Sequence, residues 1–155
     1  MKQRFLVLAL AAASLTAALP VHARDCSGYN THVNISLEST KLADGHVMIV
    51  SRASDILVTD DPKHIYNLMM GECSGTLLTT PDGKTSGLGH CLRKDKDGDT
   101  ASIDWSLPAG SDKGTWKSTG GTGKYADLQS SGWWQPAASD GGKLGVNRWG
   151  GTCSK

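Results

Sequence analysis

The feature that most constrains this chain is a turn between two cysteines, Thr80-Pro81-Asp82-Gly83-Lys84. Proline at the first corner, aspartate at the second and glycine in the left-handed position are typical of a three-residue hairpin loop. Such a loop pairs Thr80 with Lys84, and counting outward along both strands brings Cys73 opposite Cys91. Non-hydrogen-bonded pairs hold their Cα atoms about 4.5 Å apart, which a disulfide can span. The sequence therefore predicts a hairpin closed by a Cys73–Cys91 bond.

A second turn follows at Lys96-Asp97-Gly98-Asp99. The Asp-Gly pair is typical of a two-residue type I′ hairpin, whose register places His90 opposite Trp105. In an antiparallel sheet one face packs on the core and the other meets water. We predict that the core face carries Leu88, His90, Leu92, Ile103, Trp105 and Leu107, and that the solvated face carries Gly87, Gly89, Cys91, Arg93, Ser102, Asp104 and Ser106.

The N-terminal segment predicts export. Residues 1–23 contain Lys2 and Arg4, then an apolar run over 5–19, and end at Ala23, which is typical of a secretory signal peptide. The apolar run is too short for a membrane span. We expect a mature domain over 24–155, with no membrane span, in the periplasm or outside the cell. The net charge of the whole chain is +1, with no basic patch, so nucleic acid is not predicted as a partner.

All four cysteines lie in the predicted mature part. An even number of cysteines in an exported chain indicates disulfides rather than metal or redox chemistry. With Cys73 and Cys91 joined, Cys26 and Cys153 remain to connect the two ends of the domain. There is no Cys-x-x-Cys pair, so we predict no metal site and no cofactor.

Turn signals roughly every ten residues separate short apolar or alternating stretches. Residues 31–38 alternate cleanly, with Val33, Ile35 and Leu37 on one face and polar residues, beginning with His32, on the other. Further strands are expected at 47–50, 55–59, 68–78, 114–118, 125–135 and 144–149, besides the two hairpins. This pattern predicts an all-β fold, a single small antiparallel barrel of about eight strands held by disulfides.

Several short motifs resemble a known superfamily. The stretch from Gly120 to Ala126, running on to Gly132, resembles the loop-strand motif of the allene oxide cyclase-like barrels, which also include dirigent-type and exported bacterial proteins. Glu72-Cys73-Ser74-Gly75, Gly89-His90-Cys91 and the turn at 95–99 also fit the bacterial members, so that the resemblance covers roughly residues 70–135. It implies an eight-stranded antiparallel barrel. The cyclase and dirigent active-site positions are not matched, so no catalytic residue is carried over.

Two other motifs have simple structural interpretations. Gly123-Lys124 is not a phosphate-binding loop, because Ser118 stands where the first glycine belongs. The acidic residues of the 95–99 turn imitate the start of a calcium loop. Thr100 and Ser106, however, occupy its sixth and twelfth positions, where glycine and glutamate are required. A hairpin tip is the preferred interpretation and a weak surface calcium site the alternative.

The candidate ligand-binding residues are Ser74, His90 and Trp105. The two hairpin registers place Ser74 opposite His90 and His90 opposite Trp105, in one row on the predicted core face. His90 then either packs in the core or contacts a ligand. Trp133 and Trp134 point to opposite faces of one strand, so only one of them lines the core.

Three function classes remain, in this order. The first is a barrel that binds a small apolar molecule in its interior or mouth. The second is an envelope protein, such as an inhibitor, that binds a protein partner through its loops and the face of Trp134. The third is a cyclase or isomerase. The sequence contains no convincing Ser-His-Asp set or pair of carboxylates facing one site, so no catalytic residue is named and an enzyme is not favoured.

Overall fold

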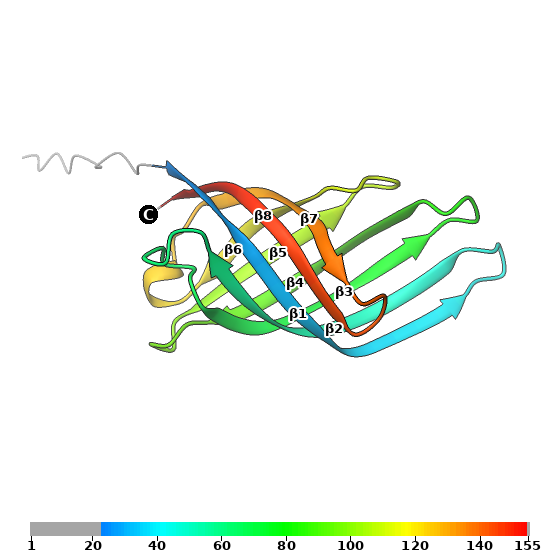
Figure 1. Ribbon diagram of the computed structural model, residues 1–155, viewed down its shortest axis with the longest axis horizontal. Helices are drawn as coiled ribbons and strands as arrows, with labels where there is room; N and C mark the ends of the chain where they lie inside the picture. The colour runs from blue at the N-terminus through cyan, green and yellow to red at the C-terminus, as the bar shows by residue number, and fades with distance from the viewer. Residues whose placement is uncertain (1–22, 155) are drawn as a thin grey trace, which may run out of the picture.

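The computed structural model describes residues 23–154, which form one closed antiparallel barrel (Figure 1). Each strand pairs with the next along the chain, and the last pairs with the first. The predicted fold class is therefore confirmed. The predicted signal peptide lies almost entirely outside the described residues. The strands are β1 (Ala23–Lys41), β2 (Val47–Thr59), β3 (Met69–Thr79), β4 (Thr85–Lys94), β5 (Thr100–Leu107), β6 (Gly114–Gly121), β7 (Ser130–Ser139) and β8 (Leu144–Ser154).

The predicted strands differ from the structure in two places. The stretches 47–50 and 55–59 belong to one continuous strand, β2. The stretch expected to begin at Tyr125 begins five residues later, because Gly123–Tyr125 forms a 3₁₀ turn, η1. None of the helical structure in residues 23–154 is long or apolar enough to cross a membrane.

The register of the first hairpin is confirmed. Thr80 donates its N–H to the carbonyl of Lys84 at 2.9 Å, and Gly83 has the left-handed φ of 83° that the turn chemistry predicts. Cys73 pairs with Cys91, and the two form a disulfide with a Cα–Cα distance of 4.0 Å. The second predicted disulfide, Cys26–Cys153, is also present and joins β1 to β8 near the two termini.

The predicted register of the second hairpin is wrong by one residue. The Asp95 carboxylate accepts the backbone N–H of Asp97 at 2.8 Å and of Asp99 at 3.0 Å. Because of these bonds, the loop begins one residue earlier than in the predicted type I′ turn. Lys94 consequently pairs with Thr100, one residue before its predicted partner. The result is a second three-residue loop, with Gly98 at a φ of 93°.

This shift by one residue exchanges the two faces of β4. His90 pairs with Asp104, and Trp105 pairs with Gly89. Leu88 and Leu92, predicted to lie in the core, are exposed on the outside, whereas Cys91 and Arg93 are buried inside. On β5 the predicted core residue Ile103 is buried, as expected.

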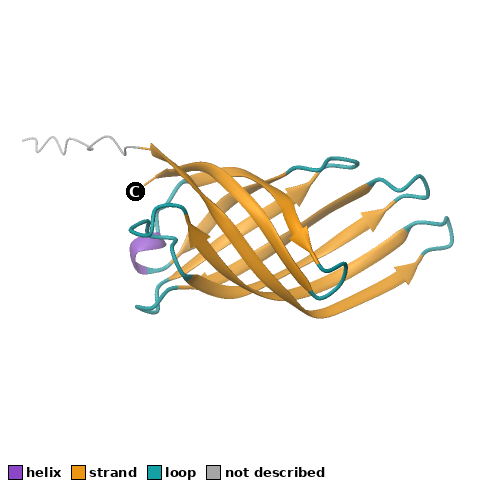
Figure 2. Ribbon diagram, viewed as in Figure 1, coloured by secondary structure: helices purple, strands orange, loops and turns teal. Residues whose placement is uncertain are grey.

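The two ends of the barrel are packed differently. At the end that carries η1, Tyr66 and Tyr125 are almost completely buried and stack with their ring centroids 5.8 Å apart. At the other end four hairpin loops separate from one another (Figure 2), and the inward residues Leu77 and Leu107 are only half-buried. We call these the closed end and the open end.

Candidate ligand-binding site inside the barrel

The predicted row of Ser74, His90 and Trp105 is not formed. Ser74 and His90 are paired neighbours, but both lie on the outside of the barrel, where they line an open groove that Trp105 also borders. His90 Nδ1 lies 2.8 Å from Asp104 Oδ1, and both side chains are about half exposed. Of these three residues, only Trp105 has its side chain packed against the core, because the register of the second hairpin differs from the predicted one.

Four tryptophans face the interior: Trp105, Trp116, Trp134 and Trp149. We call them the tryptophan wall. Trp105 packs edge-to-face on Trp134, and Trp116 packs in the same way on Trp149, with centroid distances of 5.9 Å in both pairs. Edge-to-face contact is a favourable arrangement of aromatic rings. These rings form one continuous aromatic surface over β5 to β8.

The rings lie against the wall of the barrel because glycines face them on neighbouring strands. A Cβ atom added to Gly75 would lie 2.2 Å from Cζ2 of Trp105, and one added to Gly89 would lie 2.4 Å from the same atom. A Cβ atom at Gly114 would lie 2.3 Å from the indole of Trp134. Glycine therefore makes room for the rings of Trp105 and Trp134 to lie over the neighbouring strands.

Two of the four indoles keep an unused hydrogen-bond donor. Trp116 Nε1 donates to the carbonyls of Trp133 and Gly150 at 3.2 and 3.3 Å. The Nε1 atoms of Trp134 and Trp149 are buried, and no acceptor within the described chain reaches either of them. These two tryptophans are directly paired on β7 and β8. Trp134 Nε1 lies over Gly114 on β6, whereas the indole of Trp149 leans toward Gly28 on β1. The barrel interior thus presents two separate buried donors that require acceptors.

A row of polar side chains also crosses the inside of the barrel. Arg93 donates to Asp55 through Nε at 2.9 Å, and the two side chains are 7% and 0% exposed. Gly71 pairs with both residues and allows the arginine to reach across β3. Asp55 accepts a further bond from Asn30 at 2.5 Å, and Asn147 donates to Asn30 at 3.4 Å. We call Arg93, Asp55, Asn30 and Asn147 the polar row.

His32 lies beside this row. It pairs with Asp55 across β1 and β2, and its ring lies over Gly145, where an added Cβ would be 2.4 Å from Cε1. Burial lowers the pKa of His32, and the charge of Asp55 only partly offsets this effect. The imidazole is therefore neutral at pH 7 and offers one donor and one acceptor.

Sequence reasoning missed the polar row and His32. The alternation of residues 31–38 was recognised, but the faces are the reverse of the usual assignment: Val33 and Ile35 are exposed, whereas His32 points inward. Arg93 was assigned to the solvated face by the incorrect hairpin register. The Cys73–Cys91 disulfide could have corrected this assignment. Arg93 lies two residues from Cys91 on the same strand, so both side chains must point to the same face.

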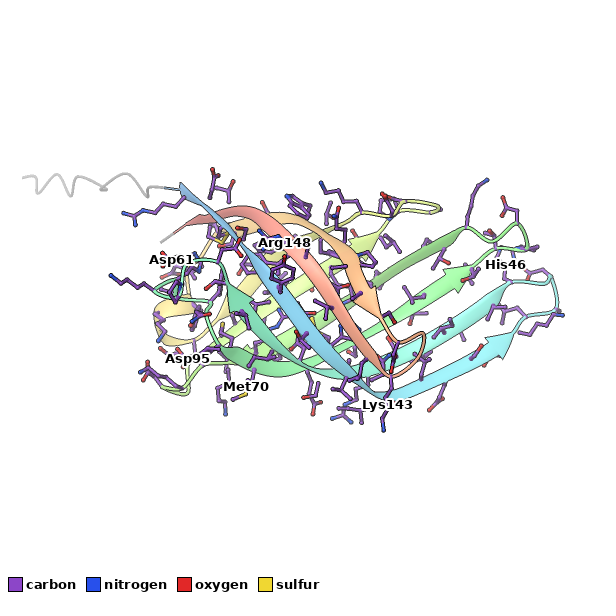
Figure 3. The ribbon with its side chains drawn as sticks, viewed as in Figure 1. His46, Asp61, Met70, Asp95, Lys143 and Arg148 are labelled. Atoms are coloured by element: carbon purple, nitrogen blue, oxygen red, sulfur yellow. A yellow bond between two sulfur atoms is a disulfide. The ribbon has the colours of Figure 1, made fainter. Side chains whose placement is uncertain are left out.

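The structure also accounts for the acidic turn at 95–99. Lys124 forms ion pairs with both Asp95 and Asp97 at the closed end, where Figure 3 labels Asp95. The hydrogen bond from Lys124 lowers the pKa of Asp95 to about 2. A lysine ammonium group thus occupies the position that a cation would take.

Comparisons with known proteins support the fold. The sequence matches no protein-family model, and no curated protein is similar in sequence. Among solved structures, a pterocarpan synthase dirigent protein superimposes with a TM-score of 0.54 at 11% identity, covering 94% of this chain and 96% of its own. A pyocyanin demethylase superimposes with a TM-score of 0.50 at 17% identity, covering 82% and 98%. The resemblance to allene oxide cyclase-like and dirigent barrels is confirmed at the level of the fold.

Proposed function

We propose that the barrel binds a small, mostly apolar molecule that carries an oxygen acceptor, and that the molecule enters through the open end. The observation that carries this proposal is the pair of buried, unpartnered indole donors on Trp134 and Trp149. A buried donor without an acceptor costs about 1–3 kcal/mol. A carbonyl, phenolic or carboxylate oxygen that accepts a hydrogen bond from one of these N–H groups removes that cost at that indole.

The tryptophan wall supports the apolar part of the proposal. Aromatic side chains provide large contact areas with little loss of conformational entropy, and ligand sites typically combine such walls with a few polar groups. Trp134 lies on the inner face and remains partly accessible, whereas Trp116 and Trp149 are buried. A ligand entering from the open end would therefore meet Trp134 first.

The polar row favours binding over acid–base catalysis. The carboxylate of Asp55 accepts hydrogen bonds from both Arg93 and Asn30. Its oxygens are therefore engaged within the protein and are not positioned to exchange a proton with a ligand. His32 remains as a neutral group that can orient a polar substituent of the ligand. The names of the two structural neighbours refer to small-molecule chemistry, which is consistent with a ligand in this type of barrel.

We also propose that the protein acts outside the cytoplasm. Both disulfides support this location, because disulfides persist in oxidising compartments. The ring of Trp134 lies inside the barrel and so does not provide the outer surface that a protein partner would need. Its neighbour Trp133 lies on the outer face of β7, beneath the ammonium group of Lys113.

The test is native mass spectrometry of the protein purified from its own cells under mild conditions. Wild-type protein should retain a small molecule. Trp134→Phe keeps an aromatic ring but removes the N–H, and we expect about a tenfold or greater loss of affinity, the effect of one hydrogen bond. Trp133→Phe is the matched control and should retain the molecule. Wild-type protein without a bound molecule, or Trp134→Phe with undiminished occupancy, would contradict the proposal.

A further inference from the structure

The register of the second hairpin brings a serine, a histidine and an aspartate together on the outside of the barrel. Ser74 on β3 pairs with His90 on β4, and His90 pairs with Asp104 on β5. Residues directly opposite each other in an antiparallel pair have Cβ atoms about 4.5–5.5 Å apart. The three side chains therefore form one row across adjacent strands, with the histidine in the middle.

The contact with Asp104 orients the ring of His90. Nδ1 of His90 lies 2.8 Å from Oδ1 of Asp104. An ionised carboxylate only accepts hydrogen bonds, so Nδ1 carries the hydrogen of this contact and Nε2 keeps the free lone pair of the neutral ring. Nε2 forms no hydrogen bond within residues 23–154. It is available as a base.

Ser74 supplies a hydroxyl group on the other side of the histidine. The residue is exposed, and its Oγ forms no hydrogen bond within the described part of the chain. A serine hydroxyl is a weak nucleophile until a neighbouring base takes its proton. The order serine, histidine, aspartate, with the aspartate on Nδ1, is the order in which a nucleophilic serine is activated.

Two hollows on the outer surface meet at this row. The larger, of about 1030 Å³, extends from β2 to β7, and the smaller, of about 420 Å³, lies mainly over β3 and β4. Ser74 and His90 line both hollows. The exposed side chain of Leu88 borders the larger hollow, and that of Leu92 borders the smaller. A substrate that bridges both hollows would place its central bond at Ser74 and an apolar group on each side.

We propose that Ser74, His90 and Asp104 form a nucleophilic site that hydrolyses esters whose acyl and alcohol parts are both apolar. Ser74 Oγ forms a bond to the carbonyl carbon while its proton passes to His90 Nε2. His90 gives this proton to the alcohol oxygen as the bond between that oxygen and the carbonyl carbon breaks, which leaves the acyl group on Ser74. Water then attacks the acyl carbon and gives a proton to His90, which returns it to Ser74 Oγ as the carboxylic acid leaves. Asp104 does not react and acts as the positioning residue for His90.

A cationic side chain lies on the far side of the nucleophile. Arg52 on β2 pairs with Ser74 and donates to Glu72 through Nε and Nη2, so that its Nη1 group is not used by this ion pair. A guanidinium group beside the nucleophile can stabilise the negative charge that develops on the carbonyl oxygen. The proposal does not depend on the ligand inside the barrel, because this row faces outward.

The test is labelling of the purified, disulfide-bonded protein with an alkyl fluorophosphonate, which forms a phosphorus–oxygen bond with an activated serine and releases fluoride. Peptide mass spectrometry should find the adduct on Ser74 in wild-type protein, and Ser74→Ala should not be labelled there. His90→Gln should react at least about 100-fold more slowly, because a positioned general base contributes about 10²–10⁴-fold. The hydrolysis of p-nitrophenyl butyrate should fall in the same variants.

The positioning role of Asp104 is tested with a conservative variant. Asp104→Asn should slow labelling at least about tenfold, the effect of one hydrogen bond to a charged group. Asp104→Glu keeps a carboxylate for the Nδ1–H group and should recover part of that loss. The matched control is Ser102→Ala, which removes an outward hydroxyl of β5 that borders neither hollow, and it should be labelled like wild type.

Far-UV circular dichroism and intact disulfides show that each variant is folded. Wild-type protein without an adduct, or with its adduct on a residue other than Ser74, would overturn the proposal. An undiminished labelling rate in folded His90→Gln would also overturn it, because Ser74 would then react without the base. If Asp104→Glu were no faster than Asp104→Asn, the positioning role of Asp104 would be wrong.

Discussion

Asp55 and Arg93 show what a buried charge requires at the scale of single residues. Both side chains are removed from water, and each compensates the charge of the other: Arg93 Nε donates hydrogen bonds to the two carboxylate oxygens of Asp55 at 2.9 and 3.2 Å. Taking charges out of water costs several kcal/mol per ion, so such a pair depends on both partners. The bond from Asn30 satisfies a further lone pair of the carboxylate.

Arg93→Met should therefore destabilise the barrel by about 3–5 kcal/mol, because it leaves the Asp55 carboxylate buried and unpaired. The double variant Asp55→Leu/Arg93→Met should recover most of this loss, because both charges are then absent. Urea denaturation of the four proteins in the cycle measures the coupling. A single variant that is no less stable than the double variant would refute this account of the pair.

His32 should make stability depend on pH. Its pKa is lowered in the folded state by burial, so the unfolded chain binds a proton more readily. The stabilisation is complete above the unfolded pKa of about 6.5 and is lost as the pH falls through the lower folded value.

Thermal unfolding between pH 7.5 and 5 measures this dependence. His32→Gln should reduce the loss of Tm on acidification. Some dependence should remain, because burial also lowers the pKa of His64. His90→Gln, on the outer face, is the control. An unchanged pH dependence in His32→Gln would contradict the proposed environment of this residue.

At the scale of elements, the barrel is organised by inward tryptophans that lie over glycines of neighbouring strands. An added Cβ at Gly89 would lie 2.2 Å from the carbonyl oxygen of Ser74 and 2.4 Å from the ring of Trp105. Backbone and ring would both have to move. Such overpacking typically costs about 1–3 kcal/mol.

Gly89→Ala should accordingly lower the free energy of unfolding by about 1–3 kcal/mol. Gly142→Ala is the matched control, because an added Cβ there meets no atom within 4 Å, and it should change stability by less than about 0.5 kcal/mol. Chemical denaturation followed by tryptophan fluorescence compares the two variants. Equal effects would show that the ring does not lie where we describe it.

The two central hairpins show how far the sequence could predict these elements. The first was predicted correctly because turn chemistry and the Cys73–Cys91 spacing agree. The second was shifted because the side chain of Asp95 accepts two backbone N–H groups, a preference that the Asp-Gly signal does not reveal. Since side chains alternate along a strand, a shift of one residue moved His90 from the predicted interior to the surface.

The inner site was harder to predict for another physical reason. The alternation in β1 shows that its two faces differ, but it does not show which face is inside. An inner surface that carries Asn30, His32 and Asp55 contradicts the usual assumption that polar residues face water. Only the closed set of strand pairings, in which β8 joins β1, fixes the direction of each side chain.

At the scale of the whole molecule, two disulfides constrain loops of very different length. Cys26 and Cys153 are 127 residues apart, whereas Cys73 and Cys91 are 18 apart. Loop-closure entropy gives about 5 kcal/mol for the long loop and about 3 kcal/mol for the short one. The bond between β1 and β8 therefore contributes more to keeping the barrel closed.

Replacing Cys26 and Cys153 by alanine should cost about 2 kcal/mol more stability than replacing Cys73 and Cys91. Thermal and urea unfolding of the two double variants provide the comparison. An equal or smaller loss for the Cys26–Cys153 variant would mean that the pairing of β1 with β8 alone is sufficient to close the barrel.

The central claim is that a small molecule accepts hydrogen bonds from Trp134 and Trp149 inside the barrel. The most direct measurement compares the ¹H–¹⁵N signals of the five indole groups in protein that retains its co-purified molecule and in protein freed of it by unfolding and refolding. We expect the signals of Trp134 and Trp149 to shift and the outer Trp133 signal to stay unchanged. A shift confined to Trp133, or five unchanged signals, would contradict it.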